Sequence, residues 1–333
     1  MSEVGAYLRD NAALRAAVGV APGEVLEACP LGSGEHNLNY QFEAGGRKFV
    51  LRVNVAPQPF HENQVAYEFA ALQALAPSGC TPLPVYLDDS PAALGKGVIV
   101  ESFCEGRALD FDNLQPGDLD CAVRLMADVH AVPVAAGCPL HRPVDSLRGL
   151  FEECLARFEI YRASAFEDAR ITKWAERFIK AAERALAASR QPADGNRIVN
   201  TETLPSHFLI AEGGGAFVDW ERPIIGEVAQ DVAYFVSPTT TFWDSDFLFP
   251  SSQVDALVED YWRAVDGRFE RGSFDDRFRA WRMMTALRST TWCCRALVDY
   301  SRPDAHKTQR TIEKLPIYLS DDFMNLVADE CFA

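Results

Sequence analysis

Apolar and polar residues alternate along the first hundred positions in the manner of β-strands. Val25 to Cys29 is a short apolar stretch, and Leu38 to Glu43 and Lys48 to Val53 alternate as half-buried strands do. Ala44-Gly45-Gly46 lies between the last two segments, which predicts a β-hairpin. The same pattern predicts a helix and two further strands, at residues 62–76, 85–87 and 97–103.

The period of the pattern changes beyond about residue 118. Apolar residues then recur at the spacing of amphipathic helices, interrupted by a compact β-rich island at 198–218 in which Gly213-Gly214-Gly215 makes a turn. The clearest predicted helices are 119–132, 147–163, 171–189, 228–235, 254–265 and 274–297. We therefore predict an α+β fold of two lobes, with a small β-rich lobe at 1–105 and a larger, mostly helical lobe at 106–333.

The charge of the chain argues against some classes of partner. Its 333 residues include 32 Lys and Arg and 48 Asp and Glu, for a net charge of −16. Such a surface repels phosphate backbones and anionic lipids, so we expect neither nucleic acid nor a membrane as partner, whereas a cationic small molecule would be attracted. The nine cysteines form no C-x-x-C pair, and Met1 to Arg15 has no apolar signal segment, which favours a reduced, cytoplasmic protein.

A glycine-containing loop enters the predicted hairpin. Backbone N–H groups at Gly32, Ser33 and Gly34 suit phosphate oxygens, because glycine leaves them unobstructed. The pattern lacks the third glycine of G-x-G-x-x-G, since Asn37 stands in that place. Taken alone, the loop has two interpretations, a phosphate site or a tight entry to the hairpin that binds no ligand. The second is the more favoured.

A possible buried ion pair follows the loop. Arg52 ends an apolar strand, and Glu68 lies on the next predicted helix. A cation held by a helix carboxylate positions nucleotide phosphates in some enzymes. The alternative, an edge-strand arginine and an exposed glutamate that are both solvated, is about equally favoured.

The β-rich island contains several polar residues at the ends of its strands. Asn200 and Glu202 precede the second strand, His207 follows Glu202 by five residues, and Asp219 follows the third strand. In protein kinases a catalytic Asp, a metal-binding Asn and a second metal-binding Asp have this order and spacing. The alternative is that three polar residues stand at ordinary hairpin ends without a shared function. This explanation serves for any one of them but is less attractive for all of them together.

These segments together resemble the aminoglycoside phosphotransferase and choline kinase family, over nearly the whole chain. The resemblance is carried by the residues at 32–40, 49–52, 67–72, 98–106, 125–130, 217–221 and 226–233. It implies a two-lobed, protein-kinase-like fold with ATP in the cleft. By the same resemblance, the segment from Gly32 to Asn37 covers the phosphates, Arg52 paired with Glu68 holds them, and the backbone from Glu101 to Phe103 contacts adenine.

The resemblance also implies the catalytic and metal-binding residues, with two departures. The family usually has His-Gly-Asp followed by Asn five residues after the Asp, whereas this chain has Asn200-Thr201-Glu202 and His207. Asn200 and Glu202 are then the candidate catalytic residues, with Glu202 as the base. Asp219 and His207 are the candidate metal ligands. Mg²⁺ prefers oxygen ligands and Mn²⁺ tolerates nitrogen better, so Asp219 would carry most of the metal binding.

Some remaining polar and aromatic residues have simpler interpretations. His61, His130, His141 and His306 have no partner at metal or triad spacing and are interpreted as packed or surface histidines. The segment from Thr239 to Asp244 is predicted to be a polar and aromatic loop, either walling the acceptor pocket or capping a helix.

The sequence thus predicts an ATP-dependent phosphotransferase that uses Mg²⁺, or Mn²⁺, and acts on a hydroxyl of a small polar or cationic metabolite. The alternative is a kinase-fold nucleotide-binding or regulatory protein with impaired catalysis, motivated by the altered loop. The sequence does not indicate the acceptor, the choice between ATP and GTP, or the oligomeric state.

Overall fold

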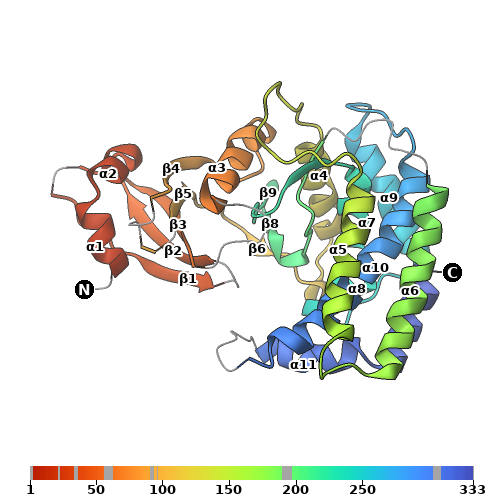
Figure 1. Cartoon of the computed structure of the whole chain (residues 1–333). Helices are drawn as coiled ribbons and strands as arrows, with labels where there is room; N and C mark the ends of the chain where they lie inside the picture. Colours follow the sequence, from red (N-terminus) through yellow and green to blue (C-terminus); the bar gives the residue numbers. More distant parts are fainter. Residues whose placement is uncertain are drawn as a thin grey trace.

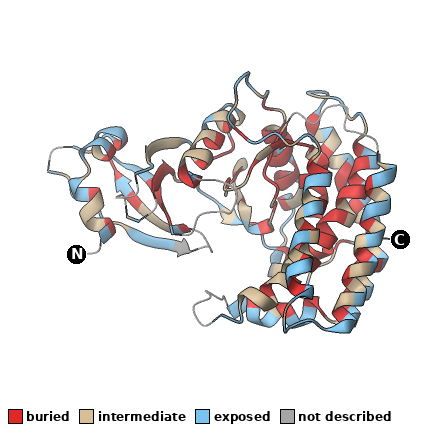
Figure 2. Ribbon diagram, viewed as in Figure 1, coloured by how far each residue is buried: buried red, intermediate tan, exposed pale blue. Residues whose placement is uncertain are grey.

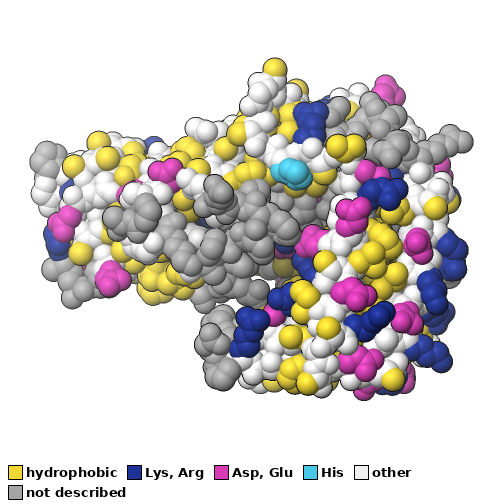
Figure 3. Space-filling model, viewed as in Figure 1, with side chains coloured by type: hydrophobic (Ala, Val, Ile, Leu, Met, Phe, Trp, Pro, Cys, Tyr) yellow, Lys and Arg dark blue, Asp and Glu magenta, His cyan; other side chains and the backbone are white. Residues whose placement is uncertain are grey.

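The chain folds into a sheet-containing N-terminal part and a larger helical part, which lie side by side in Figure 1. This computed structural model describes residues 3–21, 23–33, 37–55, 63–90, 94–95, 97–189, 197–302 and 309–332. Within these residues, no helix is both long and apolar enough to cross a membrane. Figure 3 shows acidic and basic side chains interspersed over the visible face of the helical part.

The N-terminal part is built on an antiparallel five-stranded sheet of order β1-β2-β3-β5-β4. The predicted hairpin is present, and Gly45 and Gly46 adopt positive φ angles of 56° and 72° in its turn. The strands are β1 (Cys29–Ser33), β2 (Asn37–Ala44), β3 (Arg47–Asn54), β4 (Pro84–Asp88) and β5 (Val98–Ser102).

The first predicted strand, at Val25 to Cys29, is wrong by four residues. Val25 is 79% exposed, and pairing with β2 begins only at Cys29 and continues to Ser33. Gly32 and Ser33 therefore belong to a strand rather than to the loop, because their backbone pairs with Asn39 and Leu38.

Two short helices precede the sheet where the sequence predicted none. They are α1 (Glu3–Asp10) and α2 (Ala12–Val18). Asn11 caps α2 through its side chain, and Leu8, Leu14 and Val18 are buried in the same core as Phe42. Burial of this face stabilises helices that are too short to form alone.

The predicted helix at 62–76 is α3 (Gln64–Leu75), which packs against β4 and β5 of the sheet and also contacts the helical part. Its apolar residues Ala71, Leu72 and Leu75 belong to the core of that part rather than to the core of the sheet. Its N-terminal half is joined to the chain beyond residue 220, since the Gln64 amide donates to Glu221 O (2.6 Å) and the Tyr67 hydroxyl donates to Pro223 O (2.5 Å).

The helical part contains all six helices that the sequence predicted beyond residue 118, with ends shifted by a few residues. Figure 2 shows their buried faces turned toward one another. The described helices are α4 (Asp118–His130), α5 (Ser146–Arg162), α6 (Ala169–Ala188), α7 (Val228–Phe235), α8 (Pro238–Asp244), α9 (Ser251–Val265), α10 (Phe274–Asp299), α11 (Gln309–Tyr318) and α12 (Asp321–Cys331).

The predicted loop from Thr239 to Asp244 is helix α8, which corrects that prediction. Pro238 occupies the first turn, where its missing N–H costs nothing. Thr240 and Thr241 are buried, and Thr239 O accepts a hydrogen bond from the Tyr318 hydroxyl on α11. These residues therefore contribute to packing among the C-terminal helices.

The β-rich island is divided between two small sheets. One pairs β7 (Arg197–Val199) with β10 (Ile224–Gly226), and the other has the order β6-β8-β9. The members of the second are β6 (Arg107–Ala108), β8 (Phe208–Ala211) and β9 (Gly214–Phe217). The segments after β7 and β9, and the turn before β8, contain the polar residues singled out above.

Candidate active site

Arg52 lies at the centre of a buried charged cluster between the two parts of the chain. It comes from β3, and its side chain is 9% exposed. Its guanidinium lies 2.9 Å from a carboxylate oxygen of Glu68 on α3, 2.9 Å from one of Asp219 after β9, and 3.7 Å from one of Glu221. The structure thus brings together four residues from three separate segments of the sequence.

The cluster contains more carboxyl groups than cationic groups. Burial raises the pKa of Glu68 to about 8 against the opposing effect of Arg52, and Glu221 and Glu101 raise it further. Burial likewise raises the pKa of Glu101 to about 7, with Arg52 lowering it and Asp219 adding to the rise. A site with this excess of carboxylates is suited to a divalent cation and repels a bare polyphosphate.

Asp219 is held in an uncommon backbone conformation. Its φ of 66° is in the left-handed region, which costs a non-glycine residue about 1 kcal/mol or more. One carboxylate oxygen accepts a hydrogen bond from Arg52, and the other lies 3.2 Å from Nε2 of His207. Burial opposes ionisation of Asp219, but His207 and Arg52 outweigh it and hold its pKa well below the usual range.

The segment from Asn200 to Glu202 is fixed by buried hydrogen bonds. Asp231 on α7 accepts from the backbone N–H of Asn200 (2.7 Å) and of Thr201 (2.8 Å), and Thr201 has a φ of 74°. The Asn200 amide group donates to Asp219 O (2.8 Å), and its oxygen accepts from Glu202 N–H (3.1 Å). Asn200 is therefore a link between the loop and Asp219, in a position to fix both.

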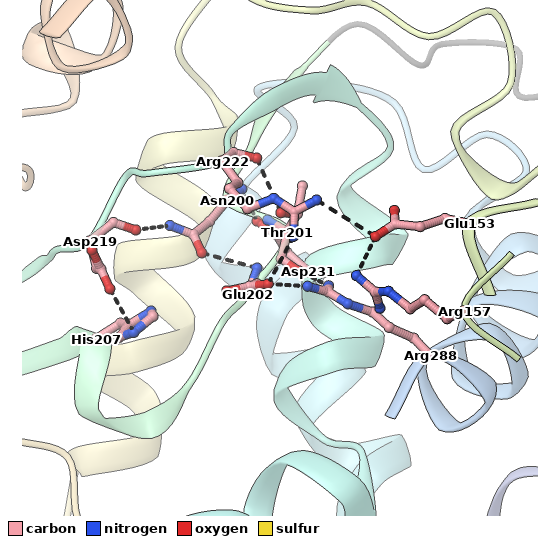
Figure 4. A network of polar contacts seen from close by, with 10 residues as sticks. All are labelled: Glu153, Arg157, Asn200, Thr201, Glu202, His207, Asp219, Arg222, Asp231 and Arg288. Atoms are coloured by element: carbon pink, nitrogen blue, oxygen red, sulfur yellow. Dashed lines mark hydrogen bonds and ion pairs between the residues drawn. The ribbon is translucent and has the colours of Figure 1, made fainter. Parts of the chain in front are cut away.

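Glu202 is paired with arginines and points away from Asp219, as Figure 4 shows. Its carboxylate accepts a short hydrogen bond from Arg288 on α10 and lies 3.6 Å from the guanidinium of Arg222. Burial raises the pKa of Glu202, but the two guanidiniums outweigh it and lower its pKa overall. In this arrangement Glu202 is a weak base.

His207 lies beside Asp219 at the start of β8. Burial lowers its pKa, but the hydrogen bond and the charge of Asp219 outweigh this and raise the pKa overall. Its Nδ1 is buried and has no hydrogen-bond partner among the described residues. No group of three or more potential metal ligands occurs in the described part of the chain. The donors fit one cation shared by Asp219 and nucleotide phosphates, whereas the imidazole nitrogen does not suit a second Mg²⁺.

The predicted phosphate loop is described only at its edges. Gly34 lies outside the described residues, and Gly32 and Ser33 are described as backbone of β1. Asn37 is 3% exposed and accepts a hydrogen bond from the Asn54 amide (3.2 Å). Its side chain therefore supports the β2–β3 hairpin in this structure.

The predicted adenine contact lies at the end of β5. Glu101 points its carboxylate into the Arg52 cluster, where it is 6% exposed. The backbone N–H of Phe103 donates to Lys48 O (3.2 Å), so it is already used within the N-terminal sheet. A donor to a base would have to come from another backbone group in this segment.

Several residues of the site were not found from the sequence. Asp231 lies within the matching segment 226–233 but was not predicted as a site residue, although a carboxylate within the apolar run of α7 is a signal that the sequence contains. His130, interpreted as a packed or surface histidine, is fully buried and contacts Asp231 (3.2 Å) and Tyr261 (2.8 Å). Arg288 lies on the buried face of α10 together with Met284. A charged residue at an apolar position of this helix was a signal that the sequence contained.

A separate pocket lies within the helical part. It has a volume of about 490 Å³ and is lined by residues of the α4–α5 connection, α9 and the start of α10, among them Trp262, Phe269 and Arg277. It contains none of the predicted site residues, so the chemistry discussed above is centred elsewhere.

Solved structures with the same fold share little sequence with this chain. A spectinomycin phosphotransferase in complex with ADP and spectinomycin has a TM-score of 0.64 at 10% identity, with 92% of each chain covered. A choline/ethanolamine kinase family protein from Mesorhizobium loti has a TM-score of 0.59 at 19% identity, covering 96% of this chain and 98% of that one. A thermostable mutant of an aminoglycoside phosphotransferase, in ternary complex with AMP-PNP and hygromycin B, has a TM-score of 0.64 at 14% identity with 99% of each chain covered.

These similarities confirm the predicted two-lobed, kinase-like fold. No curated protein matches the sequence. The model of the phosphotransferase enzyme family matches residues 27–277, which include every candidate site residue. The predicted resemblance is thereby confirmed, and the chain belongs to the phosphotransferase enzyme family.

Proposed function

We propose that this protein is a small-molecule kinase that transfers the γ-phosphoryl group of ATP to a hydroxyl of a small polar metabolite. Family membership and the kinase-like neighbours support a small-molecule phosphotransferase. The observation that carries the proposal is the convergence of Arg52, Glu68 and Asp219 at one buried point between the two parts of the chain.

In the proposed site, Arg52 contacts the nucleotide phosphates while Glu68 fixes its orientation. Neighbours crystallised with ADP, AMP or AMP-PNP are consistent with a nucleotide here. Asp219 would hold a divalent cation, which neutralises charge on the phosphates when bound. Because its carboxylate also contacts Arg52 and His207, these cationic groups compete with the metal for Asp219.

Glu202 would act as the base in the transfer step. The acceptor oxygen forms a bond to the γ-phosphorus, the bond from that phosphorus to the bridging oxygen of ADP breaks, and the hydroxyl proton passes to the Glu202 carboxylate. Phosphoryl transfer depends mostly on positioning, and Asn200 contributes by linking the Glu202 backbone to Asp219.

A second candidate function is a kinase-fold nucleotide-binding or regulatory protein with little transfer activity. The pairing of Glu202 with Arg288 and Arg222 favours it, because both guanidiniums stabilise the carboxylate and weaken it as a base. We propose a cytoplasmic location for either function, since all nine cysteines are free thiols.

One pair of measurements separates the two functions. Thermal unfolding with ATP and Mg²⁺ or Mn²⁺ reports binding, and ADP release across a panel of amino alcohols, sugars, hydroxy acids and aminoglycosides reports transfer. A kinase shows both stabilisation and acceptor-dependent ADP release. Stabilisation without transfer to any acceptor would favour the second function, and the absence of nucleotide binding would contradict both.

A further inference from the structure

Three arginines from distant parts of the chain gather beside Glu202. Arg157 comes from α5, Arg222 from the segment after β9, and Arg288 from α10. Figure 4 shows Arg157 and Arg288 on the opposite side of Glu202 from Asp219 and His207, and Arg222 above Glu202 with its guanidinium turned toward Glu153. If phosphates occupy the Arg52 and Asp219 side, this cluster, here called the arginine cluster, faces the acceptor.

The arginine cluster has more positive than negative charge. Arg157 pairs closely with Glu153, Arg288 pairs closely with Glu202, and Arg222 lies 3.8 Å from Glu153 and 3.6 Å from Glu202. Two carboxylates, those of Glu153 and Glu202, thus lie among the three guanidiniums.

The other titratable groups near the arginine cluster are neutral or have partners of their own. The ring of Tyr234 lies 5.2 Å below Arg288, and burial raises its pKa to about 12, so it is neutral. The buried thiol of Cys154 is neutral for the same reason. The Asp231 carboxylate accepts from the backbone of Asn200 and Thr201 and contacts His130.

One donor of the arginine cluster is unused. Nη1 of Arg157 is buried and has no hydrogen-bond partner among the described residues. Burial, with the nearby charges of Arg288 and Arg222, lowers the pKa of Arg157 despite the attraction of Glu153. The arginine cluster is also open to solvent, because Glu202, Glu153 and Arg222 keep 36%, 24% and 21% of their side chains exposed.

We propose that the acceptor hydroxyl compound carries an anionic group, a carboxylate or a phosphate, which binds to Arg157, Arg222 and Arg288. This inference rests on the proposed kinase function and specifies its substrate class. Guanidinium groups bind either anion through paired hydrogen bonds, and here they would supply an unsatisfied donor and the surplus charge. A cationic acceptor would instead be repelled by the arginine cluster.

The proposed anion also bears on the base. By attracting Arg288 and Arg222, a bound anion would loosen their hold on Glu202, whose carboxylate would then be free to accept the hydroxyl proton. A bound anion would therefore make Glu202 a stronger base than its pairing with Arg288 and Arg222 allows.

Four probes that share a three-carbon hydroxylated skeleton test the charge preference: glycerate, glycerol 3-phosphate, neutral glycerol and cationic 3-amino-1,2-propanediol. Binding to the full chain is measured by calorimetry in the presence of ADP and Mg²⁺, and transfer by ADP release with ATP. We expect saturable binding of at least one anionic probe and none of the cationic probe. Equal or tighter binding of the neutral or cationic probe, or no binding of either anion, would overturn the inference.

The Arg157→Gln variant locates the binding site, and Arg148→Gln is its control on the exposed face of the same helix. Loss of one charged contact should weaken anion binding roughly ten- to a hundredfold, without changing the affinity for ADP. Arg157→Lys should restore part of the loss. If Arg157→Gln binds the anions as wild type does, the proposal is wrong. If ADP binds but only neutral or cationic acceptors are phosphorylated, the kinase function stands and the anionic acceptor fails.

Discussion

Asp219 combines a left-handed backbone with contacts to both Arg52 and His207. The Asp219→Asn variant keeps the shape of the side chain and removes the charge that would hold a cation. We expect phosphoryl transfer to fall by about a hundredfold or more, and the unfolding temperature to fall as well, because Arg52 and His207 each lose a charged partner. ADP release and thermal unfolding of the same preparation measure the two effects. Asp276→Asn, at an exposed carboxylate on α10, is the control, and unchanged turnover in Asp219→Asn would remove the proposed metal role.

Glu101 gives a pH dependence whose sign follows from its raised pKa. Its pKa is about 7 in the folded protein and near 4.5 in the unfolded chain, so the folded state binds the extra proton between these values. The contribution of Glu101 to the free energy of unfolding therefore falls as the pH rises from about 5 to 8, by an amount on the order of 1–3 kcal/mol.

The Glu101→Gln variant should consequently be more stable than wild type at pH 8, and the difference should vanish near pH 5. Urea unfolding of both proteins across this range measures it. A difference that does not change with pH would show that the carboxyl of Glu101 is already ionised at pH 5 in the folded protein.

Individual residues were predictable from the sequence where their order along the chain was informative. Arg52, Glu68 and Asp219 could be identified as candidate site residues because Arg52 ends a strand, Glu68 lies on the next helix and Asp219 follows a later strand. Protein kinases have equivalent residues in the same order. The pairing of Glu202 with Arg288 could not be predicted, because it joins residues 86 positions apart and depends on how α10 packs. The charge near the acceptor likewise could not be inferred from the net charge of −16, which counts surface residues far from the site.

At the scale of elements, one side chain from α7, that of Asp231, accepts two backbone hydrogen bonds from the loop after β7. Asp231→Ala would leave the backbone N–H groups of Asn200 and Thr201 without their buried acceptor. It would also remove the carboxylate that contacts His130. We expect a loss of about 2–4 kcal/mol in the free energy of unfolding, and a smaller loss for Asp231→Asn, which keeps one acceptor oxygen. Denaturant unfolding measures both, with the exposed Asp255→Ala on α9 as control. If Asp231→Ala, Asp231→Asn and Asp255→Ala all lowered the free energy of unfolding by the same small amount, the proposed support of the loop by Asp231 would be contradicted.

Helices with long periodic patterns were predicted well, whereas α7 is a short helix that was predicted and α1, α2 and α8 are short helices that were not. The helices from α4 to α7 and the β2–β3 hairpin contain enough apolar positions to reveal their period. The short helices α1, α2 and α8 are only seven or eight residues long and are stabilised by burial against distant partners. That burial is a tertiary effect which local pattern does not contain.

At the scale of the whole molecule, nucleotide and metal should bind cooperatively. The Arg52 cluster is rich in carboxylates, so a bare polyphosphate meets repulsion that a divalent cation relieves. We expect ATP with Mg²⁺ or Mn²⁺ to stabilise the fold by about 2.7 kcal/mol at a hundredfold excess over Kd, and ATP with EDTA to stabilise it much less. Thermal unfolding with each ligand alone and both together measures this. Equal stabilisation with and without metal would count against a cation at Asp219.

The overall fold was predictable because several modest motifs occur in one order over nearly the whole chain. No single motif was sufficient, as the glycine loop and the ion pair each had a plain alternative. The boundary at 105/106 remains a prediction. Residues of α3, which precede this boundary, pack in the core of the helical part, so the two predicted lobes share a core across it.

The attachment of α3 limits how independent the first 105 residues can be. A fragment cut at that boundary would expose Ala71, Leu72 and Leu75 to water and would lose the anchors of Gln64 and Tyr67 on residues 221 and 223. Such a fragment should aggregate and be poorly soluble by itself. Because α3 also packs against β4 and β5, it joins the sheet to the larger half, and any motion of one relative to the other would strain one of these two sets of contacts.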